Sequence, residues 1–169
     1  AMNDGGTPLY MACQEDHTNV VKALLATKEI QINQAANGGA TPLAVACEKG
    51  HVKVINALLA RKEIHINQAR KDGVTPLLLA CQKGHVKVVN ALLARIEIHI
   101  NQPTNDGVTP LYVACSYGHV DVVRLLLARK EIQINQALEN GMTPLYITCT
   151  KGHVDVVRLL LARKEIQIN

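Results

Sequence analysis

The sequence has very few aromatic residues and no strong bias of charge. Among its 169 residues there is no tryptophan and no phenylalanine, and only four tyrosines. The hydrophobic content of 48% must therefore come mainly from Leu, Val, Ile and Ala. This content, together with only 19% charged residues, excludes a disordered tail. The chain is long enough for one domain with a sizeable core.

Membrane, secretion and nucleic-acid features are missing as well. No apolar run reaches the roughly 18–20 residues that a membrane helix needs, and the first residues do not have the pattern of a signal peptide. There is no Asn-x-Ser/Thr glycosylation site. The net charge of +4 is too small and too scattered for a nucleic-acid-binding stripe. We therefore expect no membrane or nucleic-acid partner and an intracellular, cytoplasmic location.

The sequence does contain a tandem repeat. Five of its six prolines and all five of its cysteines recur at an interval of 34 residues. The positions are Pro8, Pro42, Pro76, Pro110 and Pro144, and Cys13, Cys47, Cys81, Cys115 and Cys149. Such self-similarity decides the architecture before any other signal. We expect a single domain, 1–169, made of five copies at about 1–34, 35–68, 69–102, 103–136 and 137–169.

The third copy shows what one unit is expected to form. Asp72-Gly73 is a turn signal, and Thr75-Pro76 is typical of a helix start, because Thr caps the end and Pro suits the first helical position. The pattern predicts a first helix over Pro76–Gln82, closed by Gly84, and a second helix over Val86–Ala94. The alternating Ile-Glu-Ile-His-Ile-Asn tail predicts an extended return to the next turn.

Two short motifs accompany this repeat. Thr-Pro-Leu begins at residues 7, 41, 75, 109 and 143, and Gly-His begins at residues 50, 84, 118 and 152. With Thr-Pro-Leu in five copies and Gly-His in four, the sequence resembles the ankyrin-repeat family over nearly its whole length. The resemblance implies an all-α solenoid of stacked helix-turn-helix units with short hairpin-like turns between them. It also implies a non-catalytic protein–protein interaction module that binds a partner protein through its concave groove.

The sequence departs from the family pattern at three places. The His that usually follows Thr-Pro-Leu is replaced by Tyr10, Ala44, Leu78, Tyr112 and Tyr146. The repeat is 34 residues instead of about 33. The usual Gly-Ala after the second helix is absent, so we expect this helix to end without a glycine cap and to run longer.

The two ends of the repeat array differ. Repeat one has Asp16-His17-Thr18 where the others have Gly-His-Val, which is more polar, as expected of an N-terminal cap. Residues 119–135 and 153–169 are identical, so repeat five shows no such change. We expect a monomer whose C-terminal face is open to another repeat and supports weak end-to-end association.

The recurring cysteines and histidines are not expected to form a catalytic, cofactor or metal site. Zinc sites need about four converging ligands, and a catalytic cysteine needs one special environment rather than five equivalent ones. Equivalent positions in stacked helices lie roughly 8–10 Å apart, too far for a disulfide. We expect the cysteines to fill small buried slots, the Gly-His histidines to bond to backbone at the inter-helix turn, and His65 and His99 to face solvent.

The informative positions are those at which the copies differ. They lie at the turn tips, before each Thr-Pro, and along the first helix, where the resemblance places the binding groove. Exposed tyrosine and arginine are favoured interface anchors. The predicted partner-binding residues are Arg70, Lys71, Asp72, Val74, Leu78, Lys83, Asn105, Asp106, Val108, Tyr112, Ser116, Tyr117, Met142 and Tyr146. Leu78, Tyr112 and Tyr146 share one motif position, and packing between helices is the alternative for them.

Another interpretation of the function stays open. The near-identity of the repeats and the Ala1-Met2 start also fit an engineered or consensus-like scaffold, and the end at Asn169 fits a fragment excised from a longer array. Either would have no native ligand of its own. An enzyme is not expected, since the sequence shows no phosphate loop, Ser-His-Asp set or paired acidic cluster.

Overall fold

The computed structural model describes residues 5–168, so the features noted at Ala1-Met2 and Asn169 lie outside the described residues. In this range the chain forms ten α-helices and no strands. They are α1 (Pro8–Gln14), α2 (Thr18–Leu25), α3 (Pro42–Lys49), α4 (Val52–Leu59), α5 (Pro76–Gln82), α6 (Val86–Leu93), α7 (Pro110–Ser116), α8 (Val120–Leu127), α9 (Pro144–Lys151) and α10 (Val154–Leu161). The all-α prediction is confirmed.

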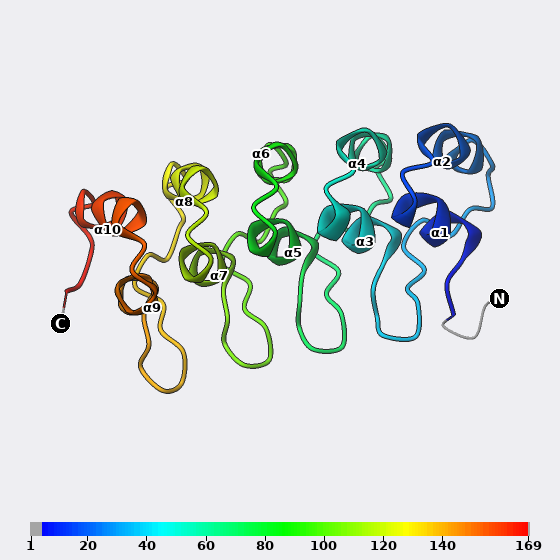
Figure 1. Ribbon diagram of the computed structural model, residues 1–169. Helices are drawn as coiled ribbons and strands as arrows, with labels where there is room; N and C mark the ends of the chain where they lie inside the picture. Colours follow the sequence, from blue (N-terminus) through cyan, green and yellow to red (C-terminus); the bar gives the residue numbers. More distant parts are fainter. Residues whose placement is uncertain (1–4, 169) are drawn as a thin grey trace.

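The helices stand in two rows. The first helices of the pairs (α1, α3, α5, α7 and α9) pack side by side, and the second helices form a parallel outer row. Long loops connect successive pairs and project to one side of the first row (Figure 1). Within each pair the two helices contact each other, and each pair also contacts the neighbouring pairs along the stack. This arrangement is the stacked solenoid that the repeat pattern predicts.

Each first helix begins as the sequence predicts. The threonine of every Thr-Pro motif is the N-cap, and its side-chain oxygen accepts a hydrogen bond of 3.1 Å from the backbone N–H three residues later. Proline follows at the first helical position, where its missing N–H costs no hydrogen bond. The predicted bounds of α5, Pro76–Gln82, are confirmed. Local capping chemistry therefore sets where this row of helices starts.

The second helices end differently from the prediction. They span eight residues each, and α6 stops at Leu93 with Ala94 as its C-cap, so the expectation of a longer helix is wrong. As expected, no glycine caps this end. In α6 the carbonyl of Leu93 accepts a 2.7 Å hydrogen bond from Arg129 of the next repeat. A long-range cation thus occupies the position that a local glycine motif usually fills.

The return segment is also corrected by the structure. Residues 98–102 form no strand; turns closed by Ile98 N–H to Arg95 and by Gln102 N–H to His99 hold this tail instead. The alternation seen in the sequence survives as alternating burial, since Ile98 and Ile100 are buried and His99 is exposed. The side chains of Ile98 and Ile100 therefore enter the core from an irregular backbone, whereas Ile96, at the start of the tail, is exposed.

One continuous apolar core runs along the stack. Leu, Val, Ile, Ala and Cys side chains from all five pairs belong to it. Cys13, Cys47, Cys81 and Cys115 are buried, as predicted, whereas Cys149 is exposed. Loss of hydration raises the pKa of Cys13 and Cys115 to about 12 and also raises the pKa of Cys47 and Cys81. The four buried thiols are therefore poor nucleophiles at neutral pH.

Candidate functional site

The loops between repeats end in tight hairpin turns. In repeat three the N–H of Gly73 donates to the carbonyl of Arg70 at 3.0 Å, and the N–H of Arg70 donates to Val74 at 2.9 Å. Gly73 has φ +83°, and a Cβ there would lie 2.7 Å from the backbone N of Asn105 in the next hairpin. Glycine is thus required both by the turn and by the close stacking of neighbouring hairpins.

Polar side chains hold the third and fourth hairpins together. Asp72 pairs with Arg70 at 3.1 Å and also accepts a hydrogen bond from the N–H of Val74. Asn105 donates from its side chain to the carbonyl of Lys71 and from its backbone to the carbonyl of Asp72. The side chains of Arg70, Asp72 and Asn105, which are predicted contact residues, therefore also fix the shape of the hairpins. The side chains of Lys71, Asp72 and Asn105 remain exposed at the tips.

The shared position after Thr-Pro-Leu has two different environments. Leu78 and Tyr112 are buried, with Tyr112 only 7% exposed, because the neighbouring helix pairs cover them. Tyr146 occupies the same position in α9 and is 58% exposed. The packing alternative thus applies to Leu78 and Tyr112, whose burial removes them from the surface available to a partner. Burial also raises the pKa of Tyr112.

Tyr117 is the most distinctive exposed residue of this region. It lies directly after α7, is 54% exposed, and stands where other repeats carry Glu15, Lys49, Lys83 and Lys151. Its ring stacks on the His119 ring, with centroids 6.0 Å apart and an angle of 8° between the planes. The side-chain amide of Gln82 donates to its hydroxyl at 3.5 Å. A large aromatic side chain is therefore both open to solvent and held in position.

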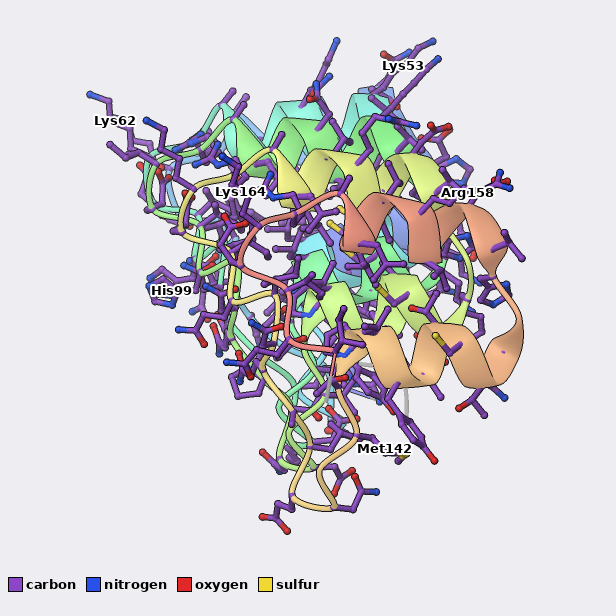
Figure 2. All side chains as sticks on the ribbon, turned by 90° about the vertical axis from the view of Figure 1, so that its left-hand side faces the viewer. Lys53, Lys62, His99, Met142, Arg158 and Lys164 are labelled. Atoms are coloured by element: carbon purple, nitrogen blue, oxygen red, sulfur yellow. The ribbon has the colours of Figure 1, made fainter. Side chains whose placement is uncertain are left out.

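The remaining predicted residues differ in exposure. Lys83 and Asp106 are exposed, whereas Val74, Val108, Ser116 and Met142 are half-buried. Figure 2 shows Met142 in the corner between the projecting hairpins and α9, with Lys62 and His99 on the opposite side of the loops. We call the exposed and half-buried members of this set the variable face: Arg70, Lys71, Asp72, Val74, Lys83, Asn105, Asp106, Val108, Ser116, Tyr117, Met142 and Tyr146.

The Gly-His histidines make the backbone bonds that the sequence predicts, but to the preceding repeat. The Nε2–H of His51, His85, His119 and His153 donates at 2.9–3.1 Å to the carbonyl at the end of the previous first helix. His65 and His99 are exposed, as predicted. Across residues 5–168, no group of three or more His, Cys, Asp or Glu side chains is placed to hold a metal ion.

Two further sets of contacts between repeats were not predicted. Arg61, Arg95, Arg129 and Arg163 donate to carbonyls at the end of the preceding second helix. Asn33, Asn67, Asn101 and Asn135 each bond to two backbone groups of the following return segment, at 2.7–2.9 Å. We call these, with the histidine bonds, the histidine, arginine and asparagine bridges. The recurrence of these arginines and asparagines every 34 residues was the signal in the sequence from which the bridges could have been predicted.

Each bridging arginine also meets a carboxylate two residues later. Arg129 contacts Glu131 at 2.9 Å, and Arg95 contacts Glu97 at 2.7 Å. A hydrogen bond from its own backbone N–H and a second from Arg129 lower the pKa of Glu131. The same two causes lower the pKa of Glu63, Glu97 and Glu165. These carboxylates are solvent-exposed and orient the arginines rather than form a reactive pair.

The family model for ankyrin repeats (3 copies) matches residues 1–70, 39–103, 59–137 and 98–169. The chain belongs to the ankyrin-repeat family. No curated protein sequence matches it. Ankyrin repeats are in general protein–protein interaction modules and are typically non-catalytic. Within the described part of this ankyrin-repeat chain, no helix combines the length and the apolar character needed to cross a membrane.

Proposed function

We propose that this ankyrin-repeat chain binds a partner protein through the variable face, in the concave groove between the hairpins and the first helices. The observation that carries the proposal is the environment of Tyr117, which is exposed yet held by His119 and Gln82. An aromatic side chain that is already ordered loses little conformational entropy on binding, and such residues often dominate interface energies.

The charges around Tyr117 suggest the chemistry of the partner. Lys49, Lys83 and Lys151 stand at the same repeat position and are exposed, and Lys71 is exposed at a hairpin tip. A partner with an apolar pocket that receives Tyr117, and with carboxylates around that pocket, would complement the tyrosine and these lysines. Charges at the rim of an interface act mainly on the rate of association and on specificity. The partner is therefore proposed to be acidic around its contact site.

The buried members of the predicted set support this surface from beneath. Leu78 and Tyr112 lie on α5 and α7 and pack in the core between neighbouring helix pairs. This packing keeps the first helices at a fixed spacing, so that the exposed residues form a largely preformed surface. The proposal includes a single domain of five repeats that acts without catalysis and resides in the cytoplasm.

The experiment is an affinity capture from nuclease-treated lysate. The parent is compared with a Lys71→Glu, Tyr117→Ala variant. We expect a band that the parent retains and this variant loses, because the variant removes the ordered aromatic and reverses a charge at a hairpin tip of the same variable face. Both proteins must show the same far-UV circular dichroism. Tyr112 is left unchanged because it is buried, and its removal would damage the core.

The matched control carries Lys62→Glu and Ile96→Ala. These changes alter the charge equally and remove a similar exposed apolar group, on the loops after α4 and α6. Figure 2 shows Lys62 on the side of the loops opposite Met142. The control should retain the band. Loss of the band with both variants, or with neither, would contradict binding at the variable face. No captured protein at all would favour an engineered scaffold or an excised fragment without a ligand.

A further inference from the structure

The C-terminal face of the stack exposes side chains that are buried in every preceding repeat. Leu161 is 48% exposed where Leu127 is 5% exposed, and Ile168 is 71% exposed where Ile134 is 6% exposed. Cys149 is exposed, whereas the other four cysteines are buried. A cavity of about 390 Å³ opens on this face, lined by Gly141, Thr143, Leu145, Tyr146, Cys149, Gln167 and Ile168. Repeat five thus presents an inter-repeat surface to solvent.

This face also presents the polar groups of an inter-repeat contact. At the four internal junctions, histidine bridges end on the carbonyls of Gln14, Glu48, Gln82 and Ser116. Arginine bridges end on the carbonyls of Leu25, Leu59, Leu93 and Leu127. At the same 34-residue spacing, repeat five offers the carbonyls of Thr150 and Leu161. The apolar surface and two acceptors therefore recur together a fifth time.

We propose that this face docks one further ankyrin repeat that carries a histidine and an arginine ten residues apart. The spacing is that of His119 and Arg129, which bridge from repeat four to repeat three, since 129 − 119 = 10. The histidine would donate to Thr150 and the arginine to Leu161, while apolar side chains cover Cys149 and Ile168. This proposal does not rest on binding at the variable face, although a docked repeat would also cover Tyr146, which lines the cavity.

A second copy of this chain is a poorer occupant. Its repeat one exposes Val20, whose counterparts in the other repeats are buried, and it carries His17, so it could supply apolar contact. However, Thr27 stands at the arginine position of repeat one, and its hydroxyl donates to Leu24 of its own helix at 2.7 Å. The arginine bridge could not form. Continuity with the four internal junctions thus favours a repeat of the internal type.

The test appends a copy of residues 136–169 directly after Asn169. Because residues 153–169 are identical to 119–135, the second helix and return segment of repeat five present to the appended copy the same residues that repeat four presents to repeat five. The cysteine of the appended copy is changed to alanine, so that Cys149 remains the reporter. The rate of its reaction with a thiol reagent such as Ellman's reagent is measured in the native protein. We expect Cys149 to react at least about tenfold more slowly than in the five-repeat parent, because docking would bury it.

The matched control has alanine in place of the histidine and arginine of the appended repeat, the copies of His153 and Arg163. We expect its Cys149 to react at least about tenfold faster than in the intact six-repeat protein, since both bridges are lost. Three outcomes would overturn the proposal. In the first, Cys149 reacts with the reagent at the same rate in the six-repeat protein and in the parent. In the second, Cys149 is equally protected with and without the two bridging side chains. In the third, Cys149 of the parent reacts more slowly as the protein concentration rises. The last would identify a second copy as the occupant.

Discussion

Tyr112 and Tyr146 are the same residue type at the same repeat position, yet only Tyr112 is buried. We therefore expect Tyr112→Ala to lower the free energy of unfolding by about 3 kcal/mol, because it removes a large side chain from the core and leaves a cavity. We expect Tyr146→Ala to cost less than about 1 kcal/mol, as usual for an exposed position. Urea unfolding of both variants measures the difference. Equal losses would show that Tyr112 is not a core residue in solution.

The same pair shows what the sequence could and could not predict about single side chains. The Thr-Pro-Leu motif located Leu78, Tyr112 and Tyr146 on the first helices, and the structure places them there. Their burial depends on whether another helix pair covers them, and that neighbour lies 34 residues away in the chain. The residues next to each position in the sequence do not show whether a neighbouring helix pair covers it. Hence the variable positions were identified together, although only some of them lie at the surface.

Substitution of the glycine after the first helix is expected to cost different amounts in the middle of the stack and at its C-terminal end. Gly84 and Gly152 have φ +69° and +73°, so an alanine at either position is strained. A Cβ on Gly84 would also lie 2.7 Å from the His119 ring, whereas a Cβ on Gly152 meets no atom within 4 Å. We expect Gly84→Ala to destabilise the protein by at least about 1 kcal/mol more than Gly152→Ala. Denaturant midpoints that coincide for these two variants would refute this.

The arginine bridges take the place of glycine caps on the second helices. Arg129 donates to the carbonyl of Leu93 at 2.7 Å, and its side chain is only partly exposed. We expect Arg129→Ala to lower the unfolding free energy by about 1–2 kcal/mol, because α6 loses a charge-assisted partner at its C-terminal end. Glu131→Gln, which keeps the arginine, should leave the thermal midpoint near that of the parent. If the glutamine variant were the more destabilised, the ion pair and not the cap would be the stabilising contact.

The exposed Arg–Glu pairs predict a small acid sensitivity. The pKa values of Glu63, Glu97, Glu131 and Glu165 are lowered below the ordinary value of 4.5 by backbone and arginine hydrogen bonds in the folded state. Their stabilisation is therefore present above about pH 4.5 and is lost as the pH falls through the lower folded pKa. A variant with all four changed to Gln should lose less stability than the parent between pH 6 and pH 3. Parallel urea midpoints over this range would contradict the prediction.

The two kinds of helix were predictable to different degrees for a physical reason. Thr75 and Pro76 cap α5 from adjacent positions, so its bounds follow from the local sequence. The end of α6 is set by Arg129, which comes from the next repeat. Because the capping arginine lies 36 residues after Leu93 in the chain, the local sequence does not show where α6 ends. The helix was therefore expected to be longer. The return segment was expected to be extended, but turns and the asparagine bridges from the preceding repeat organise it instead.

Along the whole stack, each repeat is stabilised mainly by its two neighbours. Helix contacts join adjacent pairs, and the histidine, arginine and asparagine bridges likewise connect consecutive repeats. In such a one-dimensional array the stability is approximately a sum of repeat and interface contributions. Repeats two to four have an interface on both sides, whereas repeats one and five have one each in this structure. The exposure of Leu161 and Ile168 is the consequence at the C-terminal end.

This difference predicts a gradient of opening along the molecule. We expect native-state amide hydrogen exchange to be slowest in α5, α6 and α7 and fastest in the terminal helices, α9 and α10 among them. The physical reason is that a terminal repeat opens by breaking one interface, while a central repeat opens only if two are broken. Exchange should be followed by mass spectrometry at a pH where reclosing outpaces exchange. Uniform protection over all ten helices would mean that the stack unfolds as one cooperative unit, and the nearest-neighbour description would then be wrong.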